Sequence, residues 1–194
     1  LVTGIDLIKA QIRIAAGEPL VANCLVPSSA GIGICVGGGA KPTLRGCRVV
    51  RSRGAGLLVT ERAGGLVEEC EFAESTQAGI EVREGANPVV RGTRVHGGRS
   101  AGIFVHEQGA GRFEANEIAE NTLTGVEVKA GAVPVLVRNR IERNGYEGVW
   151  VHAGAGGEFV DNWLKGNRRG AWDGDGDRRA HRGVDAAGEA EDDG

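Results

Sequence analysis

Six side chains able to bind a ligand recur in the middle of this chain, at positions that would share one side of a strand. They are two aromatic rings, two imidazoles, a carboxylate and an amine: Phe104, His106, Glu127, Lys129, Trp150 and His152. Residues two apart on a strand point to the same face, so each ring would lie beside an imidazole. Outward aromatic side chains surrounded by charge are typical of surfaces that recognise proteins or sugars. We therefore expect these six residues, called the aromatic patch below, to bind a partner; a terminal cap over Trp150 is the alternative explanation for that ring.

Catalytic and metal-binding patterns are weaker elsewhere in the sequence. Glu61, Glu84 and Glu107 stand 23 residues apart and could together bind a cation. Arg62 and Arg83 beside them instead favour a solvated, charge-balanced row. The four histidines lack the spacing of metal ligands, and the repeats lack the clustered carboxylates that polysaccharide-cleaving enzymes need. We therefore expect no catalytic residues, no metal site and no cofactor.

A glycine that returns every 23 residues determines the elements that must position these side chains. The six positions are Gly33, Gly56, Gly79, Gly102, Gly125 and Gly148. Aliphatic residues stand one and three positions after each glycine, which is the period of a strand with one buried face. Each unit has room for three short strands and no amphipathic helix, and identical side chains at equal offsets favour stacking at the ~4.8 Å spacing of strands. The sequence predicts an all-β, single-stranded parallel β-helix of about seven coils.

A second period of 46 residues divides the coils into two alternating kinds. Pro42, Pro88 and Pro134 stand nine residues after alternate glycines. Charge alternates as well, and the clearest row reads Arg48, Glu71, Arg94, Glu117 and Arg140. Neighbours in such a row would lie one strand apart, where opposite charges attract. We expect these charges to determine which coil lies beside which, with less than about 1 kcal/mol from each exposed pair.

The cysteines follow the same period. One row contains Cys24, Cys47 and Cys70 and continues as Thr93, Asn116, Asn139 and Asn162. We interpret it as a structural stack of thiols and hydrogen-bonding amides, because a linear stack does not converge on a metal ion as three or four ligands must. A metal site or a disulfide is the alternative. Reduced thiols, and a first segment unlike a secretion signal, favour an intracellular protein of the cytoplasm or nucleus.

The pair of coils between Asn87 and Ile118 resembles a known repeat. The phrase NPVVRGTRVH, followed by GIFVHE and FEANEI, is similar to the CASH-type right-handed β-helix repeats of the F-box-only family of ubiquitin-ligase substrate receptors. The resemblance extends from about Gly31 to Asn167. It implies a right-handed helix whose surface binds another protein. The sequence contains no F-box segment, so a ligase role would need a further part or partner.

Residues 1–20 resemble a different protein. The stretches VTGIDLIK and QIRIAAGEPL are similar to a helix of biotin carboxylase, but the catalytic elements of that enzyme are absent and its activity is not expected. Ile5, Ile8 and Ile12 share one face at helical spacing, and Gly17 suits a C-terminal stop. We expect a short amphipathic helix that caps the first coil. The alternative makes Ile12 and Ile14 part of a strand in the register of the coils.

Composition limits the two ends and the range of partners. Residues 173–194 hold eight acidic residues, three arginines and a single valine, too little apolar surface to fold. We expect a helix at 1–20, the β-helix at 21–172 and a disordered, acidic, glycine-rich tail at 173–194. The net charge of −3 and the lack of a long apolar run argue against nucleic-acid and membrane partners.

These features favour a non-catalytic β-helix module that presents a flat surface to a protein, as a substrate receptor or scaffold does. The alternative is a carbohydrate-binding or polysaccharide-cleaving protein of the pectate-lyase-like class, because those proteins have a similar fold. A protein is thus the expected partner, and a polysaccharide is the second candidate. An activity screen on polyuronates would separate the two hypotheses.

Overall fold

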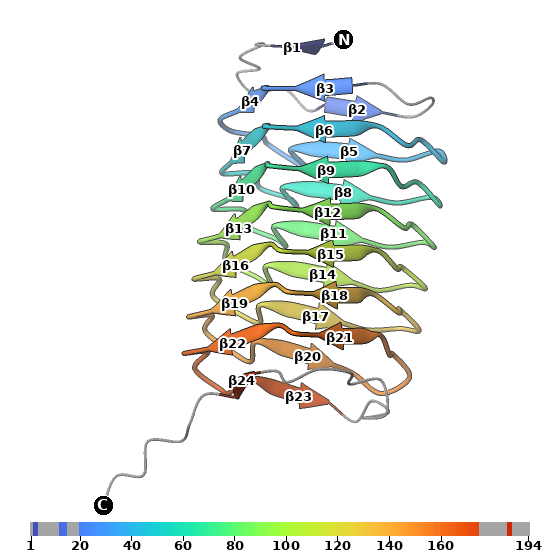
Figure 1. The fold of residues 1–194 in the computed structure, drawn as a ribbon. Helices are drawn as coiled ribbons and strands as arrows, with labels where there is room; N and C mark the ends of the chain where they lie inside the picture. Colours follow the sequence, from blue (N-terminus) through green and yellow to red (C-terminus); the bar gives the residue numbers. More distant parts are fainter. Residues whose placement is uncertain (1, 4–11, 15–19, 175–185, 188–194) are drawn as a thin grey trace, which may run out of the picture.

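The chain forms a column of stacked coils (Figure 1). The computed structural model describes residues 2–3, 12–14, 20–174 and 186–187. Their strands form three parallel sheets, called A, B and C here, and successive strands of each coil pass from one sheet to the next. Sheet C runs behind sheet A in Figure 1, and sheet B lies to the left. These residues contain no helix, and so none long and apolar enough to cross a membrane. The predicted all-β parallel β-helix is confirmed.

Each sheet has eight strands of two or three residues. Sheet A contains β1 (Val2–Thr3), β3 (Leu20–Ala22), β6 (Thr43–Arg45), β9 (Leu66–Glu68), β12 (Val89–Arg91), β15 (Arg112–Glu114), β18 (Val135–Val137) and β21 (Glu158–Val160). Sheet B contains β4 (Leu25–Val26), β7 (Arg48–Val50), β10 (Glu71–Ala73), β13 (Arg94–His96), β16 (Glu117–Ala119), β19 (Arg140–Glu142), β22 (Trp163–Lys165) and β24 (Ala186–Ala187). Sheet C contains β2 (Ile12–Ile14), β5 (Ile34–Val36), β8 (Leu57–Val59), β11 (Ile80–Val82), β14 (Ile103–Val105), β17 (Val126–Val128), β20 (Val149–Val151) and β23 (Trp172–Gly174).

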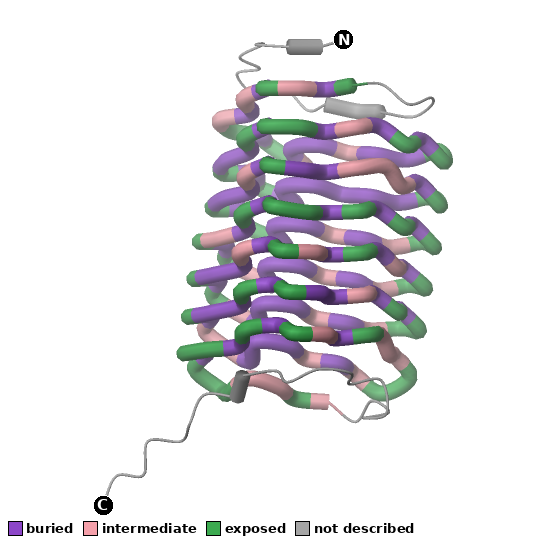
Figure 2. The backbone as a smooth tube through the Cα atoms, in the orientation of Figure 1, coloured by how far each residue is buried: buried purple, intermediate pink, exposed green. Residues whose placement is uncertain are grey.

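The core is a continuous stack of aliphatic side chains inside the column. From β4 to β22 neighbouring strands pair one repeat apart, so equivalent residues meet; in sheet C, Ile80 pairs with Ile103 and Val82 with Val105. The predicted inward valines, Val36, Val59 and Val82, are all buried. Buried residues recur in every coil between β5 and β22 (Figure 2). In β11, β14, β17 and β20 the middle residue faces outward and is half-buried, which leaves sheet C one row of side chains for contact with a ligand.

The repeated glycine is required by the close approach of successive coils. A Cβ atom at Gly56 would lie 2.6 Å from the carbonyl oxygen of Gly79 on the next coil, and one at Gly125 would lie 2.6 Å from that of Gly148. These distances are too short for any side chain without a shift of the backbone. The 23-residue glycine period therefore reflects packing between coils, directly before each strand of sheet C.

The predicted structural row between sheets A and B is confirmed as a hydrogen-bonded ladder. The side-chain amide of Asn116 donates to Oδ1 of Asn139 at 3.0 Å and to the carbonyl of Val90 at 3.0 Å. Further up the column, the backbone N–H of Cys47 donates to Sγ of Cys70 at 3.4 Å. The residue before each rung, such as Arg138 with φ 52°, is in the left-handed region, which is costly for an L-residue. The ladder satisfies the buried polar groups at this turn and so holds its strained backbone in place.

A second ladder follows sheet B, and the sequence interpretation missed it. It stands five residues after the first. Its hydrogen-bonded part runs from the backbone N–H of Gly98 through Asn121 and Asn144 to Asn167, and Ser29, Ser52 and Ser75 stand at the equivalent positions of the earlier coils. The amide of Asn121 donates to Oδ1 of Asn144 at 3.0 Å, and that of Asn144 to Oδ1 of Asn167 at 2.9 Å. The signal was present as three asparagines at the 23-residue period. Two ladders therefore brace the two ends of every sheet B strand in the lower coils.

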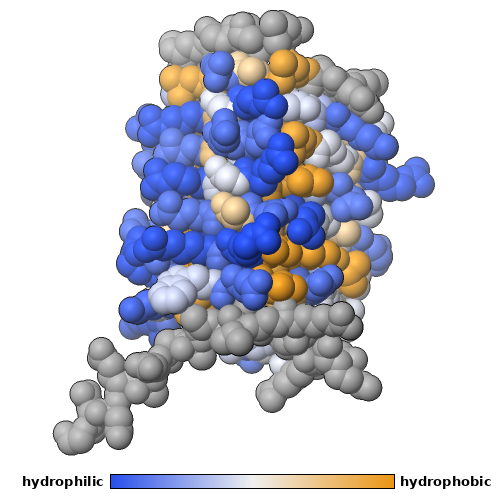
Figure 3. Space-filling view, in the orientation of Figure 1, coloured by the Kyte–Doolittle hydropathy of each residue, from blue (hydrophilic) through white to orange (hydrophobic). Residues whose placement is uncertain are grey.

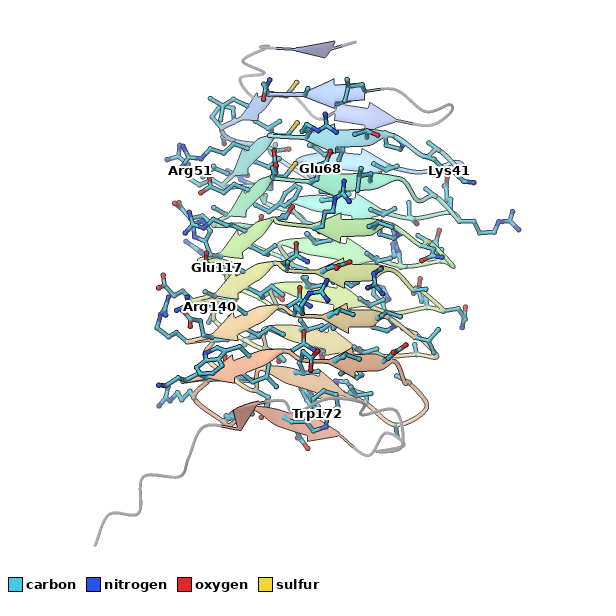
Figure 4. All side chains as sticks on the ribbon, in the orientation of Figure 1. Lys41, Arg51, Glu68, Glu117, Arg140 and Trp172 are labelled. Atoms are coloured by element: carbon cyan, nitrogen blue, oxygen red, sulfur yellow. The ribbon has the colours of Figure 1, made fainter. Side chains whose placement is uncertain are left out.

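The alternating charges pair between coils as predicted. Arg48 Nε lies 2.7 Å from Glu71 Oε2, and Arg94 Nε lies 3.3 Å from Glu117 Oε2. Glu117 and Arg140 lie on adjacent strands of sheet B (Figure 4), although Arg140 bonds Glu142 of its own strand at 2.7 Å. The ion pairs between coils thus contribute to the register. The Arg140–Glu142 pair within one strand competes with the expected pairing of Arg140 and Glu117.

The expected N-terminal helix is not found at the described positions. Residues 2–3 form β1 and residues 12–14 form β2, which pairs in parallel with β5, Ile12 opposite Ile34. The alternative interpretation, a strand containing Ile12 and Ile14 in the register of the coils, is therefore correct at this point. Pairing with the open edge of β5 satisfies backbone groups that a helix would leave exposed. Residues 1, 4–11 and 15–19, over which the rest of the expected helix falls, lie outside the described residues.

The acidic tail also contributes strands. Strand β23 extends from Trp172 to Gly174 and pairs with β20, and β24 pairs with β22, Trp163 opposite Ala186. Of the expected tail, residues 173–174 and 186–187 are described, and both stretches are in strands, because the last coils offer unpaired backbone groups at their edge. The rest of the expected tail, residues 175–185 and 188–194, lies outside the described residues. The division of the chain at residues 20 and 172 stays a prediction.

Candidate functional site

The outer face of sheet C brings the six residues of the aromatic patch together. Strand pairing places Phe104 beside Glu127 and Glu127 beside Trp150, on β14, β17 and β20. All six side chains are half-buried, so each leaves part of its surface in contact with solvent. The predicted order, with Glu127 between the two rings, is confirmed.

Each aromatic ring lies against an imidazole of the same strand or the turn that follows it. The rings of Phe104 and His106 are stacked, with centroids 4.2 Å apart and planes 17° apart. Trp150 and His152 repeat the arrangement at 4.0 Å and 34°. These contacts hold the rings in one orientation on the sheet, and such prearranged aromatic surfaces lose little conformational entropy when a ligand binds.

Each imidazole is also bonded to a carboxylate on the coil before it. Nε2 of His106 lies 3.1 Å from Oε1 of Glu81, and Nε2 of His152 lies 3.0 Å from Oε1 of Glu127. The His106 side chain is 14% exposed and that of His152 is 25% exposed. A carboxylate bonded to one ring nitrogen fixes the tautomer and leaves the other nitrogen able to accept a proton.

Lys129 carries the positive charge at the centre of the patch. Its Nζ lies 2.5 Å from Oε1 of Glu127, 5.5 Å from the centroid of Phe104 and 5.8 Å from that of Trp150. The side chain is 39% exposed. An ammonium between two aromatic faces, and still open to solvent, can meet an anionic group of a ligand that rests on the rings.

These contacts form two copies of one unit, which the sequence interpretation did not identify. The first consists of Glu81, Arg83, Phe104 and His106, and the second of Glu127, Lys129, Trp150 and His152. In each, a glutamate on one strand is followed by a base directly after that strand. On the next coil, an aromatic residue on the strand is followed by a histidine directly after it. Arg83 Nε lies 3.7 Å from Glu81 Oε1, the counterpart of the Lys129–Glu127 pair. The sequence feature that could have revealed the two units is the 46-residue period of prolines and charges, because the same period relates the residues on this face.

The glutamate row beside the patch makes bonds within the protein. Glu61 Oε2 accepts from the backbone N–H of Gly38 at 2.7 Å, and Glu84 Oε2 accepts from the hydroxyl of Thr60 at 2.8 Å. Glu107 lies 3.7 Å from Nδ1 of His106. Among the described residues, no three His, Cys, Asp or Glu side chains are placed so that they could hold a metal ion. The solvated, charge-balanced row is the better interpretation of these glutamates.

A second charged group lies on the opposite side of the column. Glu68 is bonded to Arg91, with Nη2 at 2.7 Å, and to Arg45 (Figure 4). The Arg91 and Arg45 guanidiniums lower the pKa of Glu68. A shallow pocket of about 290 Å³ lies against Glu68, Arg91 and Glu114. The face with sheet A is largely hydrophilic, with hydrophobic side chains gathered along one side (Figure 3). Because Glu68, Arg91 and Glu114 each pair with another charged side chain of the protein, we assign the pocket to coil stacking.

The buried thiols belong to the first ladder rather than to a reactive site. Hydrogen bonding to Cys47 and burial both raise the pKa of the Cys70 thiol. A protonated, buried thiol that donates to the carbonyl of Glu68 at 3.3 Å is a structural group.

Stacked parallel strands, two polar ladders and an outward row of rings and charges define the class of protein. Residues 11–180 match the family model described as a right handed beta helix region, which covers most of the chain. The chain belongs to this right-handed β-helix family. No curated protein matches the sequence.

Two solved structures have a similar fold at low sequence identity. The crystal structure of the periplasmic alginate epimerase AlgG aligns with a TM-score of 0.79 and 14% identity, over 92% of this chain and 48% of that chain. The crystal structure of pectate lyase Pel9A aligns with a TM-score of 0.71 and 16% identity, over 87% of this chain and 54% of that chain. This chain therefore spans about half the length of either protein.

These comparisons correct several expectations from the sequence. None of them shows the resemblance to the F-box-only family or to biotin carboxylase. The family match does show the right-handed β-helix. The expected non-catalytic protein-recognition module is contradicted, because the similar folds are those of two polysaccharide-acting enzymes. The expected intracellular location is also contradicted, since the first of these proteins is periplasmic. The repeat pattern led to the wrong function because the repeated residues are those that stack the coils. The same stacking occurs in proteins of unrelated function.

Proposed function

We propose that this chain is a carbohydrate-active β-helix that binds an acidic polysaccharide on the outer face of sheet C and acts on its uronate residues. The fold supports the proposal, since a pectate lyase and an alginate epimerase have similar coils and their substrates are polymers of uronic acids. Because each of those proteins is about twice as long as this chain, the substrate and the reaction are proposals for this chain.

The position of Lys129 between two aromatic rings is the observation that carries the proposal. Apolar faces of pyranose rings rest on flat aromatic side chains, as other apolar groups do. Phe104 and Trp150 offer two such surfaces, and Lys129 Nζ lies within 5.8 Å of both centroids. A uronate whose neighbours rest on these rings would direct its carboxylate to this ammonium, which is a charge-assisted contact. A neutral polymer would lack that contact.

The residues around Lys129 also suit proton transfer at a uronate. The hydrogen on C5 becomes acidic when the charge of the adjacent carboxylate is neutralised, which Lys129 would do. His152 is the proton acceptor in this proposal, because it is the more exposed of the two imidazoles and is held by Glu127. With Nε2–H donating to Glu127, Nδ1 is unprotonated in the neutral ring and accepts the proton from C5.

Two outcomes share this first step. The electron pair left on C5 delocalises into the neutralised carboxylate. Return of a proton to the opposite side of C5 inverts that carbon, as in epimerisation. Departure of the oxygen on C4 together with a proton forms a C4–C5 double bond and cleaves the chain, as in a lyase. Loss of the C5 hydrogen to solvent is common to both reactions. Epimerisation in D₂O replaces it with deuterium, whereas the lyase product carries no hydrogen on C5 and is detected by its C4–C5 double bond.

The proposal is tested with polygalacturonate, polymannuronate and polyguluronate, and with a neutral glucan as the control polymer. We expect at least one polyuronate to bind. Incubation in D₂O should either place deuterium at C5, as epimerisation does, or yield chains with a C4–C5 double bond, as a lyase does. Lys129→Ala should weaken that binding by about 10-fold or more, the range for a hydrogen bond to a charged group. Lys41→Ala, which removes the same charge from an exposed turn, is the matched control. Equal binding by all variants, or the absence of polyuronate binding, would contradict the proposal.

A further inference from the structure

We infer that the two copies of the Glu–base–aromatic–His unit are two equivalent sugar-binding subsites, and that one polyuronate chain occupies both while running along the axis of the column. This inference rests on the proposed function and specifies the length and register of its ligand. The first subsite contains Arg83, Phe104 and His106, and the second contains Lys129, Trp150 and His152.

The two units share the same set of contacts, and the ring–imidazole and imidazole–carboxylate distances are nearly equal, while the ring planes are 17° apart in the first unit and 34° apart in the second. The distance between the ring centroids is 4.2 Å in the first unit and 4.0 Å in the second. The imidazole–carboxylate distances are 3.1 and 3.0 Å. Each cation pairs with the equivalent carboxylate of its own unit, Arg83 with Glu81 at 3.7 Å and Lys129 with Glu127 at 2.5 Å. Two surfaces with the same chemistry and orientation bind the same group.

The offset between the units fits alternate sugars of one extended chain. Equivalent residues on β14 and β20 are two coils apart, about 10 Å at the spacing of parallel strands. One pyranose of an extended 1→4-linked chain advances by a length comparable to one strand spacing. Successive sugars would thus meet Arg83, Phe104, Lys129 and Trp150 in turn, which alternates a cation with a ring. The footprint is four sugars.

The face ends on both sides of this footprint. Toward the N-terminus, the position equivalent to Phe104 and Trp150 is Leu58, which is 4% exposed and offers no surface. Toward the C-terminus, Trp150 pairs with Asp173, an exposed acid that would repel a further carboxylate. The two units are therefore the full extent of the row that faces a chain along sheet C.

Two equivalent subsites predict how affinity and stoichiometry change with ligand length. A diuronate fills one subsite, so two molecules bind each protein with equal affinity. A tetrauronate fills both, so one molecule binds, and the connection between its two halves raises the affinity by about 100-fold over the diuronate. Hexauronates should bind no more than a few-fold tighter than tetrauronates, because the face ends at Leu58 and Asp173.

The test is calorimetric titration of the whole chain with 1→4-linked oligogalacturonates and oligomannuronates of two to six units, with cellotetraose as the uncharged control. Phe104→Ala should reduce diuronate stoichiometry from two to one and remove the advantage of the tetrauronate, and Trp150→Ala should do the same. Thermal melts establish that both variants are folded, and Val133→Ala, at an exposed site outside sheet C, is the control substitution.

The outcomes separate this inference from the proposed function. If diuronates bind one to one and affinity does not change with length, the two-subsite arrangement is wrong while polyuronate binding stands. If Phe104→Ala leaves stoichiometry and length dependence as in the unchanged protein, the arrangement is equally contradicted. If no oligouronate or polyuronate binds, the proposed function fails and this inference fails with it.

Discussion

Nε2 of His152 lies 3.0 Å from Oε1 of Glu127, on the preceding coil, and the same relationship joins His106 to Glu81 at 3.1 Å, 46 residues earlier. The two-coil period that alternates charge on sheets A and B therefore also organises the outer face of sheet C. There it produces two imidazoles whose tautomers are set by a neighbouring carboxylate. This repeated pair is the basis of both the proposed chemistry and the proposed subsites.

Glu127→Gln should reduce the rate at which the C5 hydrogen is lost to solvent by about 100-fold or more, because the variant loses the anion that holds Lys129 and fixes the tautomer of His152. The melting temperature should change little, since the pair lies on the outer face. Glu158→Gln, at an exposed position on sheet A, is the matched control, and it should retain the rate because Lys129 and His152 are unaffected. Equal losses in the two variants would show that His152 is not the proton acceptor.

Gly56→Ala should destabilise the protein by about 2 kcal/mol or more, because the new Cβ would lie 2.6 Å from the carbonyl oxygen of Gly79. Gly31→Ala, where a Cβ meets no atom within 4 Å, should be tolerated. Urea denaturation measures both. Equal midpoints for the two variants would refute the explanation given for the 23-residue glycine period.

Asn139→Ala should cost about 2 kcal/mol or more in the free energy of unfolding. The buried Asn139 side chain accepts from Asn116 and donates to Oδ1 of Asn162 and to the carbonyl of Phe113, so its removal leaves several buried polar groups without partners. Asn87→Ala, at an exposed position, removes the same side chain and should have little effect. An equal stability of the two variants would mean that the ladder does not stabilise the turn.

The stability of the protein should fall in acid in a way that depends on Glu68. Arg91 and Arg45 hold the pKa of Glu68 below its ordinary value, which the unfolded chain retains. The contribution of this carboxylate is therefore fully present above the ordinary pKa of about 4.3 and is lost as the pH falls through the lower, folded-state value. Thermal melts between pH 7 and pH 2 should show a smaller acid loss in Glu68→Gln than in the unchanged protein. Parallel curves for the two would contradict the assignment.

The sequence predicted the column itself, because each inward residue repeats with its neighbours and a repeated core has few ways to pack. Val36, Val59 and Val82 could be placed from spacing alone, and so could Phe104, Glu127 and Trp150 on one face. The bonds of Lys129 and His152 to Glu127 could not be predicted from spacing, because they depend on how the side chains are oriented on the sheet. The function was predicted wrongly because most positions of the repeat are determined by the stacking of the coils. Only the outward-facing positions depend on a ligand.

The most direct test of the central claim is a crystal structure of this chain with tetragalacturonate or tetramannuronate, whichever binds more tightly. The account predicts one oligosaccharide on the outer face of sheet C, parallel to the axis of the column, with sugars on the rings of Phe104 and Trp150 and a carboxylate within hydrogen-bond distance of Lys129 Nζ. An oligosaccharide bound instead against sheet A, sheet B or an end of the column, with the rings of Phe104 and Trp150 uncovered, would contradict it.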